Sequence, residues 1–251
     1  MIIDTHNKNI LKVKTIYFSS EIVKTNADIV KYFQCKKYVE NCKVFKTNTI
    51  DLTLSFEEIK IGFSKSTKRY INQAIKKFQM ETEIISELDD RIIDDFCLFY
   101  DEVANIKNIQ KSNKRMIRRL KKNIFLSKAF NDQNLLVWHL YIFDEVRVRL
   151  LYSCSLQESA DNLKKMIPSV NKLLHSEDIK FAKNAGFKVF DFGGISLTDE
   201  GFSGISQFKL GFSKNIDESY HFVIGNTMIG RMVLFFYKIK KTIFMMVLKK
   251  G

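Results

Sequence analysis

A short stretch, FKVFDFGGISLTDEGFSGISQFKLGFS at residues 187–213, places an acid, two adjacent glycines and a lysine among apolar residues. If residues 187–192 form a strand, alternation puts Asp191 among apolar neighbours at the strand end. A carboxylate held there could accept a proton from a reacting group or orient an amine. The alternative is that Asp191 caps the next turn by accepting a hydrogen bond from the Gly193 or Gly194 amide.

The glycines and the lysine of this stretch add two further requirements of a binding site. Gly193 and Gly194 permit positive φ angles and let a ligand approach the main chain, although a tight turn explains them equally well. Lys209 lies between Phe208 and Leu210. Because lysine is rarely buried without a partner, we expect it either to bind an anionic group or to extend to the surface.

A helix over residues 66–78 is expected to position a second group of cations. Apolar residues recur there at helical spacing, and Ser66 or Thr67 is the expected N-cap. Lys68 and Arg69 then fall in the first turn, where a cation opposes the helix dipole and favours an anionic ligand. The site could hold a diphosphate together with Ser66, or the turn could be a solvated basic surface.

Three segments rich in β-branched and aromatic residues, 124–130, 135–143 and 146–154, predict an antiparallel meander. In the third segment, strict alternation puts Arg147, Arg149, Leu151 and Ser153 on one face. If that face lines a cleft, Arg149 and Ser153 contact the ligand. His139 and His175 are possible bases, but we expect both to be structural, as a lone histidine in an apolar setting usually is.

Further helices are expected at 168–185 and 203–210, and strands at 187–192 and 219–224. A strongly basic amphipathic helix is expected between Ile106 and Ile124. Its cations could bind RNA phosphates, or they could form a solvated face.

The 251-residue chain has a formal charge of +13 and a pI of about 9.4. The charge favours an anionic partner such as nucleic acid, a phosphorylated small molecule or a membrane surface, although composition bias is an alternative. The four cysteines have no metal-ligand or disulfide spacing, so we expect reduced thiols, no metal site and no permanently bound cofactor.

The two ends of the sequence bear on location. The first residues have no signal-peptide pattern, which favours the cytoplasm. Residues 232–250 are apolar, but Lys238, Lys240 and Lys241 interrupt them, so we expect no transmembrane span. The segment is expected to be a buried final strand or helix, or else a basic-aromatic segment in peripheral contact with an anionic membrane.

The order of elements over residues 106–224 is that of the GNAT acyltransferase fold. DFGGI (191–195) followed by FKLGF (208–212) resembles the C-terminal signature of the Fem-type branch of that superfamily, and residues 49–77 resemble its N-terminal segment. The resemblance implies an α/β (α+β) protein with a mixed, mostly antiparallel sheet flanked by helices. We expect a reduced N-terminal GNAT-like domain with the acceptor-binding segment at 1–105, and a C-terminal GNAT-like acyltransferase domain at 106–251.

The sequence departs from the Fem-type pattern in two respects, one in its last loop and one that bears on the donor. Ser213 and Lys214 stand where the family often has two glycines. The chain also lacks the long heptad hairpin that some members use in handling aminoacyl-tRNA, which makes tRNA the less favoured donor.

The resemblance implies transfer of an acyl group to an amine, with Asp191 and Lys209 as catalytic residues. The residues expected to bind substrate are Ser66, Lys68, Arg69, Arg149, Ser153, Phe192, Gly193, Gly194 and Phe208.

Three functions follow as hypotheses. The first is an N-acyltransferase that uses acyl-CoA as co-substrate and a nucleotide-linked amino sugar as acceptor, in cell-surface polysaccharide biosynthesis. The second is a Fem-like aminoacyltransferase that uses aminoacyl-tRNA on a peptidoglycan precursor. The third is an inactive GNAT-like module that binds nucleic acid or membrane. The acyl group, the acceptor and the oligomeric state stay open.

Overall fold

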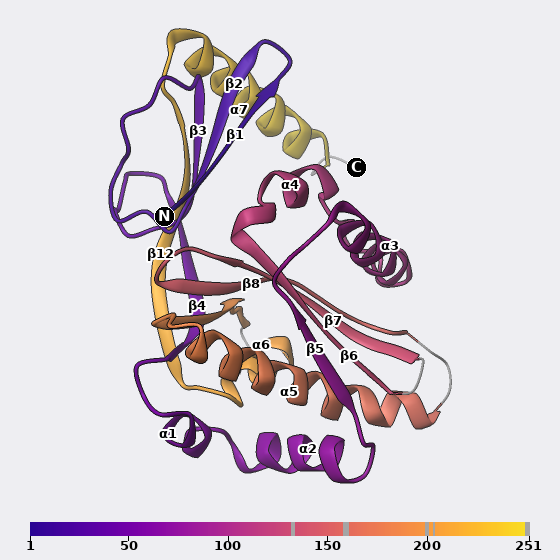
Figure 1. Cartoon of the computed structure of the whole chain (residues 1–251). Coiled ribbons are helices and arrows are strands. Elements are labelled where there is room, and N and C mark those ends of the chain that lie inside the picture. Colours follow the sequence, from indigo (N-terminus) through magenta and orange to yellow (C-terminus); the bar gives the residue numbers. More distant parts are fainter. Residues whose placement is uncertain (132–133, 158–160, 199–200, 203, 249–251) are drawn as a thin grey trace. The chain divides into compact units, whose positions relative to one another are not determined.

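The computed structural model describes residues 1–131, 134–157, 161–198, 201–202 and 204–248. The chain forms two compact units (Figure 1): unit 1 contains residues 1–45 and 218–251, and unit 2 contains residues 46–217. The chain passes between them within β4 (Lys43–Asp51) and again within β12 (Asn215–Gly225). The expected boundary at residue 105 falls inside α3 (Asp90–Lys107) of unit 2, and the reading of residues 1–105 as a reduced GNAT-like domain stays a prediction.

Unit 1 is built on four strands in the order β1-β2-β3-β12. β1 (Ile2–Lys8) and β2 (Leu11–Tyr17) form an antiparallel hairpin, β3 (Ile29–Cys35) runs parallel to β2, and β12 is antiparallel to β3. Tyr32 and Phe222 stack at the centre of its core, with ring centroids 4.6 Å apart. The unit is completed by α7 (Met228–Leu248).

In unit 2, the main described strands lie side by side in the order β4-β9-β8-β7-β6-β5. The expected meander is confirmed as β6 (Ile124–Asn131), β7 (Asn134–Phe143) and β8 (Arg147–Ser155), and β5 (Glu81–Ile85) adds to its edge. β9 (Val189–Gly194) pairs with β8 in parallel and with β4 in antiparallel fashion. A separate small pair contains β10 (Leu197–Thr198) and β11 (Gly201–Phe202). The strand arrangement is therefore mixed and mostly antiparallel, as expected.

Helices cover both faces of the unit 2 strands. On one face, α5 (Asp161–Asn184) packs Ile179 and Ala182 against a core that includes Phe125, Tyr141 and Phe190. The other helices on this side are α1 (Phe56–Ile61), α2 (Lys65–Lys76) and α6 (Gly204–Leu210), and α2 packs against α5 (Figure 1). On the opposite face, Phe96 and Tyr100 of α3 contact Trp138 and Tyr152.

The expected continuous basic helix between Ile106 and Ile124 is wrong. The helix α3 ends where Asn108 adopts a left-handed conformation at φ 51°, and a loop precedes the short helix α4 (Lys114–Arg119) and the 3₁₀ turn η1 (Lys121–Asn123). Several of these cations are neutralised by acids of α3; for example, Arg118 donates a 2.7 Å hydrogen bond to Asp94. The segment therefore has the character of a solvated face.

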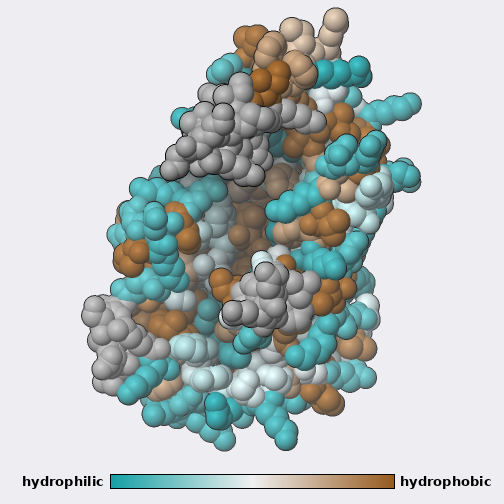
Figure 2. Space-filling view, turned by 180° about the vertical axis from the view of Figure 1, so that it is seen from behind, coloured by the Kyte–Doolittle hydropathy of each residue, from teal (hydrophilic) through white to brown (hydrophobic). Residues whose placement is uncertain are grey.

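Residues 232–250 were expected to form a buried final element or a membrane-surface segment. Residues 232–248 lie in the helix α7, so the final element is a helix, and residues 249–250 lie outside the described residues. Several described apolar side chains of α7 are exposed, including Phe235 at 61% and Phe236 at 62%, so the expected burial is wrong for those side chains. None of the described helices has the length and apolarity needed to cross a bilayer. Exposed apolar side chains also occur elsewhere, scattered among hydrophilic ones in Figure 2.

Candidate active site

The parallel strands β8 and β9 part from one another at the centre of unit 2. Their pairing covers Arg147 with Val189 through Arg149 with Asp191, after which β8 continues to Ser155 and β9 to Gly194 without further pairing between them. A pocket of about 490 Å³ lies at this opening. Its lining residues include Lys107, Arg149, Ser153, Asn171, His175, Phe192, Gly193, Gly194, Phe208 and Lys209.

Seven of the expected site residues are brought together in this pocket, which we call the Lys209 pocket. They are Arg149, Ser153, Phe192, Gly193, Gly194, Phe208 and Lys209. Lys107, Arg149 and Lys209 supply three cations, and none of the described lining residues is a carboxylate. The arrangement suits an anionic ligand or a developing negative charge.

Lys209 is held by the last residue of β9. Its Nζ donates a 2.7 Å hydrogen bond to the carbonyl oxygen of Gly194. Burial lowers the pKa of Lys209 to about 8, with a further lowering by Arg149 and an opposing effect of Asp191. The ammonium and amine forms therefore both exist close to neutral pH, which suits a proton-transfer group.

Asp191 lies behind the pocket rather than in its wall. It is fully buried, and its Oδ2 accepts a 2.8 Å hydrogen bond from Arg147 while its Oδ1 accepts a 2.7 Å bond from the Gly193 amide. Arg147 also donates to Asp217 at 2.6 Å. This geometry favours the capping alternative, in which Asp191 orders the glycine loop; its role as a proton acceptor stays a prediction.

Two glycines, Gly193 and Gly211, allow neighbouring atoms to approach the main chain closely at the site. Gly193 has a φ of 75°, and a side chain there would meet the Leu150 carbonyl oxygen at 3.3 Å. Gly211, in the FKLGF motif, accepts a 2.8 Å hydrogen bond from the Ser64 amide, and a Cβ on it would lie 2.7 Å from Thr67 Oγ1. The C-terminus of α6 therefore packs directly on the start of α2.

The expected face of the third meander strand is partly wrong. A β-bulge lies at Leu151, because Tyr141 pairs with Leu150 while Leu140 pairs with Tyr152. Cross-strand partners share a face, so the bulge moves Ser153 to the face opposite Arg149. Both residues still line the Lys209 pocket, since it opens where the strands part.

The remaining expected site residues, Ser66, Lys68 and Arg69, lie at the start of α2. The N-cap is Ser64, not Ser66 or Thr67, because the Ser64 side chain accepts the Thr67 amide. Ser66 bonds the Ser64 hydroxyl, and Lys68 donates to the Ile61 carbonyl oxygen at 3.0 Å. None of these three residues lines the Lys209 pocket.

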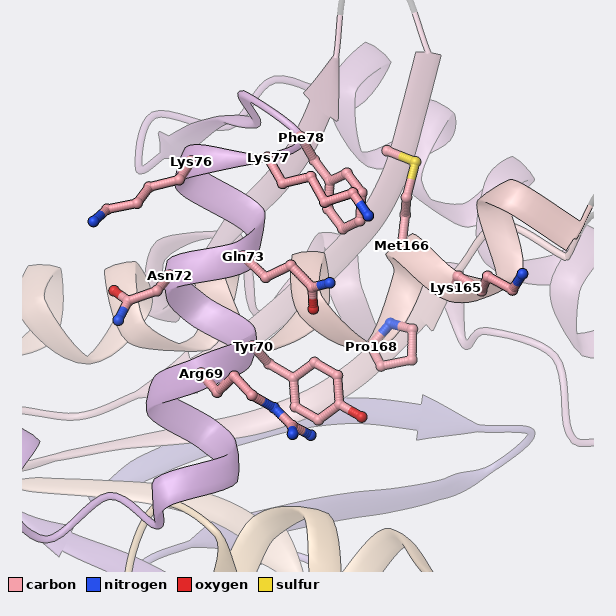
Figure 3. A pocket seen from close by; sticks show the side chains of 10 residues that line it. All are labelled: Arg69, Tyr70, Asn72, Gln73, Lys76, Lys77, Phe78, Lys165, Met166 and Pro168. Carbon is pink, nitrogen blue, oxygen red and sulfur yellow. The ribbon is translucent and has the colours of Figure 1, made fainter.

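Arg69 lines a second pocket, of about 1070 Å³, between α2 and the first turns of α5. Its other described lining residues, none of them a carboxylate, are Tyr70, Asn72, Gln73, Lys76, Lys77, Phe78, Lys165, Met166 and Pro168. Figure 3 shows Tyr70 and Gln73 of α2, and Phe78 just after it, pointing toward Met166 and Pro168, whereas Asn72 and Lys76 point away. We call this the α2–α5 pocket.

The two pockets are neighbours along one helix. Pro168 of α5 lines the α2–α5 pocket, while Asn171 and His175 of the same helix line the Lys209 pocket. A rise of ~1.5 Å per residue separates Pro168 from His175 by roughly 10 Å. Between them, the buried Lys172 donates a 2.8 Å hydrogen bond to Thr67 and lies over the rings of Tyr70, Phe208 and Phe212.

A buried polar cluster behind the pocket was not expected from the sequence. His139 and Tyr141 of β7 meet His175 and Asp178 of α5, and all four side chains are 2% exposed or less. The spacing within each pair, i, i+2 on β7 and i, i+3 on α5, does not predict such a cluster. Only the packing of α5 on β7 brings the two pairs together.

No protein-family model matches the sequence, and no curated protein is significantly similar to it in sequence. Solved structures are similar in fold. A structure of FemX has 12% identity and a TM-score of 0.64, covering 92% of this chain and 86% of that one.

Two further solved structures are similar in fold. The C-terminal domain of a putative lysylphosphatidylglycerol synthetase from Agrobacterium fabrum has 11% identity and a TM-score of 0.58, covering 93% of this chain and 83% of that one. The structure of L-PGS from Bacillus licheniformis has 10% identity and a TM-score of 0.53, covering 92% and 83%. These likenesses show that the chain shares the fold of FemX, as the resemblance of its sequence motifs implied.

Proposed function

We propose that this protein transfers an acyl group from an activated donor to a primary amine held in the Lys209 pocket. The observation that carries the proposal is Lys209 itself, a lysine with a pKa lowered to about 8 at the point where β8 and β9 part. Attack of an amine on an acyl carbonyl creates an oxyanion, and a fixed ammonium stabilises that charge most in a site of low polarity.

In this mechanism Lys209 acts in its protonated form. The hydrogen bond to the Gly194 carbonyl oxygen fixes the ammonium, and Arg149 adds positive charge on the same side of the pocket. Lys209 stabilises the tetrahedral oxyanion and can then donate a proton to the leaving group. Asp191 acts indirectly, because its bonds to Arg147 and Gly193 keep the glycine loop in place.

The favoured acceptor is a nucleotide-linked amino sugar, and the favoured donor is acyl-CoA in the cytoplasm. Arg69, Lys77 and Lys165 give the α2–α5 pocket the charge to bind a diphosphate. A separation of roughly 10 Å along α5 is short enough for an amino sugar tethered to that diphosphate to reach the Lys209 pocket. The choice of acyl-CoA as donor also rests on the sequence, which has no long heptad hairpin of the kind that some Fem-type members use in handling aminoacyl-tRNA.

A second candidate is an aminoacyltransferase that takes its acyl group from aminoacyl-tRNA. It is supported by the fold likeness to FemX and to a protein named for making lysylphosphatidylglycerol, in which the transferred group is an amino acid. The formal charge of +13 is compatible with an RNA donor.

The test is thermal stabilisation of the purified protein by CoA, UDP, dTDP and bulk tRNA at fixed salt. A ligand present at 100 times its Kd adds about 2.7 kcal/mol to the free energy of unfolding. We expect shifts with CoA and with a nucleotide. A shift with tRNA alone would favour the aminoacyltransferase, and no shift together with no turnover would leave a non-catalytic binding module.

Matched variants locate the ligands. Replacing Arg69 and Lys165 with glutamine should abolish the nucleotide shift and leave the CoA shift, if the α2–α5 pocket binds the diphosphate. The control replaces Lys111, which precedes α4, and Arg115, which lies within it, with glutamine. Loss of activity in that control, restored at lower salt, would contradict the acyl-CoA reading and favour an RNA donor.

A further inference from the structure

The wall of the Lys209 pocket at His175 continues inward as a chain of hydrogen bonds. His175 Nδ1 lies 3.0 Å from Tyr141 Oη, and Tyr141 Oη donates a 2.7 Å hydrogen bond to Asp178 Oδ2. The same carboxylate oxygen lies 2.7 Å from His139 Nδ1. His139 Nε2 is in turn 2.9 Å from Asn171, which lines the pocket as His175 does.

These bonds define the protonation of His175. A carboxylate only accepts hydrogen bonds, so Asp178 Oδ2 accepts one from the Tyr141 hydroxyl and one from the N–H at His139 Nδ1. The Tyr141 oxygen is therefore left as an acceptor toward His175, which must carry its proton on Nδ1. In a neutral ring this leaves Nε2 without a proton, and Nε2 is the ring nitrogen not engaged by Tyr141.

The surroundings of His175 keep its ring neutral. Burial lowers its pKa well below the ordinary value, and the charges of His139, Lys209 and Lys172 add to this effect. Burial and the negative charge of Asp178 raise the pKa of Tyr141 well above its ordinary value, so its hydroxyl keeps its proton at rest. His175, which lines the pocket, thus has Nε2 as an unprotonated acceptor, and the negative charge of the cluster lies on Asp178.

Asp178 is the natural end of the chain. It is fully buried, and among the described residues its Oδ1 has no hydrogen-bond partner. Both hydrogen bonds to this carboxylate are made to Oδ2, one from the Tyr141 hydroxyl and one from His139 Nδ1.

We propose that His175 is the catalytic base of the site and that Tyr141 and Asp178 form its proton relay. The inference rests on the proposed acyl transfer and deepens it by naming the group that receives the amine proton. As the amine nitrogen bonds to the acyl carbon, its N–H proton passes to His175 Nε2. The Nδ1 proton moves to Tyr141 Oη, and the hydroxyl proton moves to Asp178 Oδ2.

The step balances without a further reactant. One proton leaves the amine and one arrives on the carboxylate, so His175 ends as the other neutral tautomer and Tyr141 keeps one proton. The positive charge of the attacking nitrogen and the negative charge of Asp178 disappear together. Reversal of the chain after product release returns the proton to solvent through the pocket.

The spacing suits hydrogen bonds better than a metal ion. His139, His175 and Asp178 could offer three ligand atoms within 4.8 Å of one another. Two ligand atoms at ~2.0–2.1 Å from a tetrahedral zinc, however, lie about 3.3 Å apart. The 2.7 Å between His139 Nδ1 and Asp178 Oδ2 is a hydrogen-bond distance instead.

The first test needs no substrate. Long-range ¹H–¹⁵N correlation spectra of the histidine-labelled protein at pH 7, assigned with a His175→Gln variant, report the tautomer of each ring. We expect His175 to be neutral with its proton on Nδ1, and Tyr141→Phe to remove this preference. The control is Tyr32→Phe, which deletes a buried hydroxyl of unit 1 and should leave the spectrum unchanged.

The second test is kinetic, with acetyl-CoA and UDP-glucosamine as probes, or with the donor that stabilises the wild-type protein. His175→Ala should lower kcat by about 10²–10⁴-fold, and Tyr141→Phe by roughly 10²-fold, with little change in KM. Added imidazole should restore part of the activity of His175→Ala. A merely structural role would show no such rescue, and Tyr32→Phe should keep wild-type kcat.

The outcomes separate the two proposals. A wild-type protein that transfers no acyl group, with the expected tautomer, overturns the proposed function and with it the catalytic role of His175. Active wild-type protein with undiminished kcat in His175→Ala and Tyr141→Phe overturns the relay alone. A His175 ring that is protonated on Nε2 also overturns the relay, whatever the activity.

Discussion

Lys209 Nζ and the Gly194 carbonyl oxygen are joined by a 2.7 Å hydrogen bond that links the two sequence motifs of the site. The lysine comes from α6 and the glycine from the end of β9, so the bond ties the helix to the strand where β8 and β9 part. The carbonyl oxygen stabilises the ammonium that burial disfavours. The bond therefore fixes the position of the Lys209 ammonium, whose proton is more easily lost because burial lowers its pKa.

The pH dependence of activity should report this lysine. In the proposed mechanism Lys209 works as an ammonium, so kcat/KM should fall as pH rises through about 8, where it deprotonates. In Lys209→Arg the guanidinium stays charged at this pH, and the falling limb should move out of the measurable range. The measurement is kcat/KM from pH 6 to 10 for both proteins. A falling limb near pH 8 that persists in Lys209→Arg would show that another group titrates.

Removal of the Lys209 charge should stabilise the fold while it abolishes activity. The pKa is lowered from 10.5 to about 8, so the unfolded chain binds more protons between these values and stability rises with pH across that window. Below pH 8 the charge costs at most roughly 3 kcal/mol. Lys209→Met should therefore unfold at higher urea concentration than the wild type at pH 7, and this gain should shrink as pH approaches 10.5.

The matched control is Lys111→Met, an exposed lysine, for which no pH-dependent gain is expected. Equal stability of wild type and Lys209→Met at every pH would mean that Lys209 is solvated in the folded protein.

Asp191→Asn should destabilise the protein more than Asp217→Asn. Both carboxylates pair with Arg147, but the Asp191 side chain is fully buried, whereas that of Asp217 is 25% exposed. Breaking a buried pair costs about 3–5 kcal/mol, and the remaining Asp217 partner should keep the loss near the lower value. Urea unfolding of the two variants checks the order. A larger loss for Asp217→Asn would contradict the structural role assigned to Asp191.

The packing of α6 on α2 should not tolerate a side chain at residue 211. In Gly211→Ala the new Cβ would lie 2.7 Å from Thr67 Oγ1 and 3.0 Å from the Phe208 carbonyl oxygen. Overpacking of this kind costs about 1–3 kcal/mol. In the control, Gly204→Ala, no atom lies within 4 Å of the new Cβ. Thermal unfolding should separate the two variants, and equal melting temperatures would mean that α6 shifts freely to make room.

Local sequence patterns were sufficient to predict the strands and motifs that build the site. The meander over residues 124–155 follows from its β-branched and aromatic segments, and the pair DFGGI and FKLGF led to the fold. The same pair located Lys209 and the glycine loop, because an isolated lysine in an apolar run and adjacent glycines are visible without an alignment.

The partners of these residues depend on contacts between distant segments. The ion pair of Asp191 could not be seen in the sequence, since Arg147 lies 44 residues away on a neighbouring strand. The bulge at Leu151 has no local signature and reversed the expected face of Ser153. His139 and His175 were recognised as possible bases, but only the packing of α5 on β7 reveals that they share Asp178.

Errors at helix ends had a different cause. Several residues near the start of α2 are good capping residues, and the choice of Ser64 over Ser66 is decided by the contact with Gly211. The basic segment before β6 is interrupted at Asn108, which can adopt the left-handed conformation at modest cost. The charge pattern of this segment alone predicted one continuous helix.

The division of the chain also implies an order of folding during synthesis. Unit 2 is one uninterrupted stretch, residues 46–217, whereas the core strand β3 of unit 1 must wait for β12, in which Tyr220 pairs with Cys35. On the ribosome, unit 2 can therefore mature while the first 45 residues still lack their partner strand. Those residues are then open to chaperones, and unit 1 forms last.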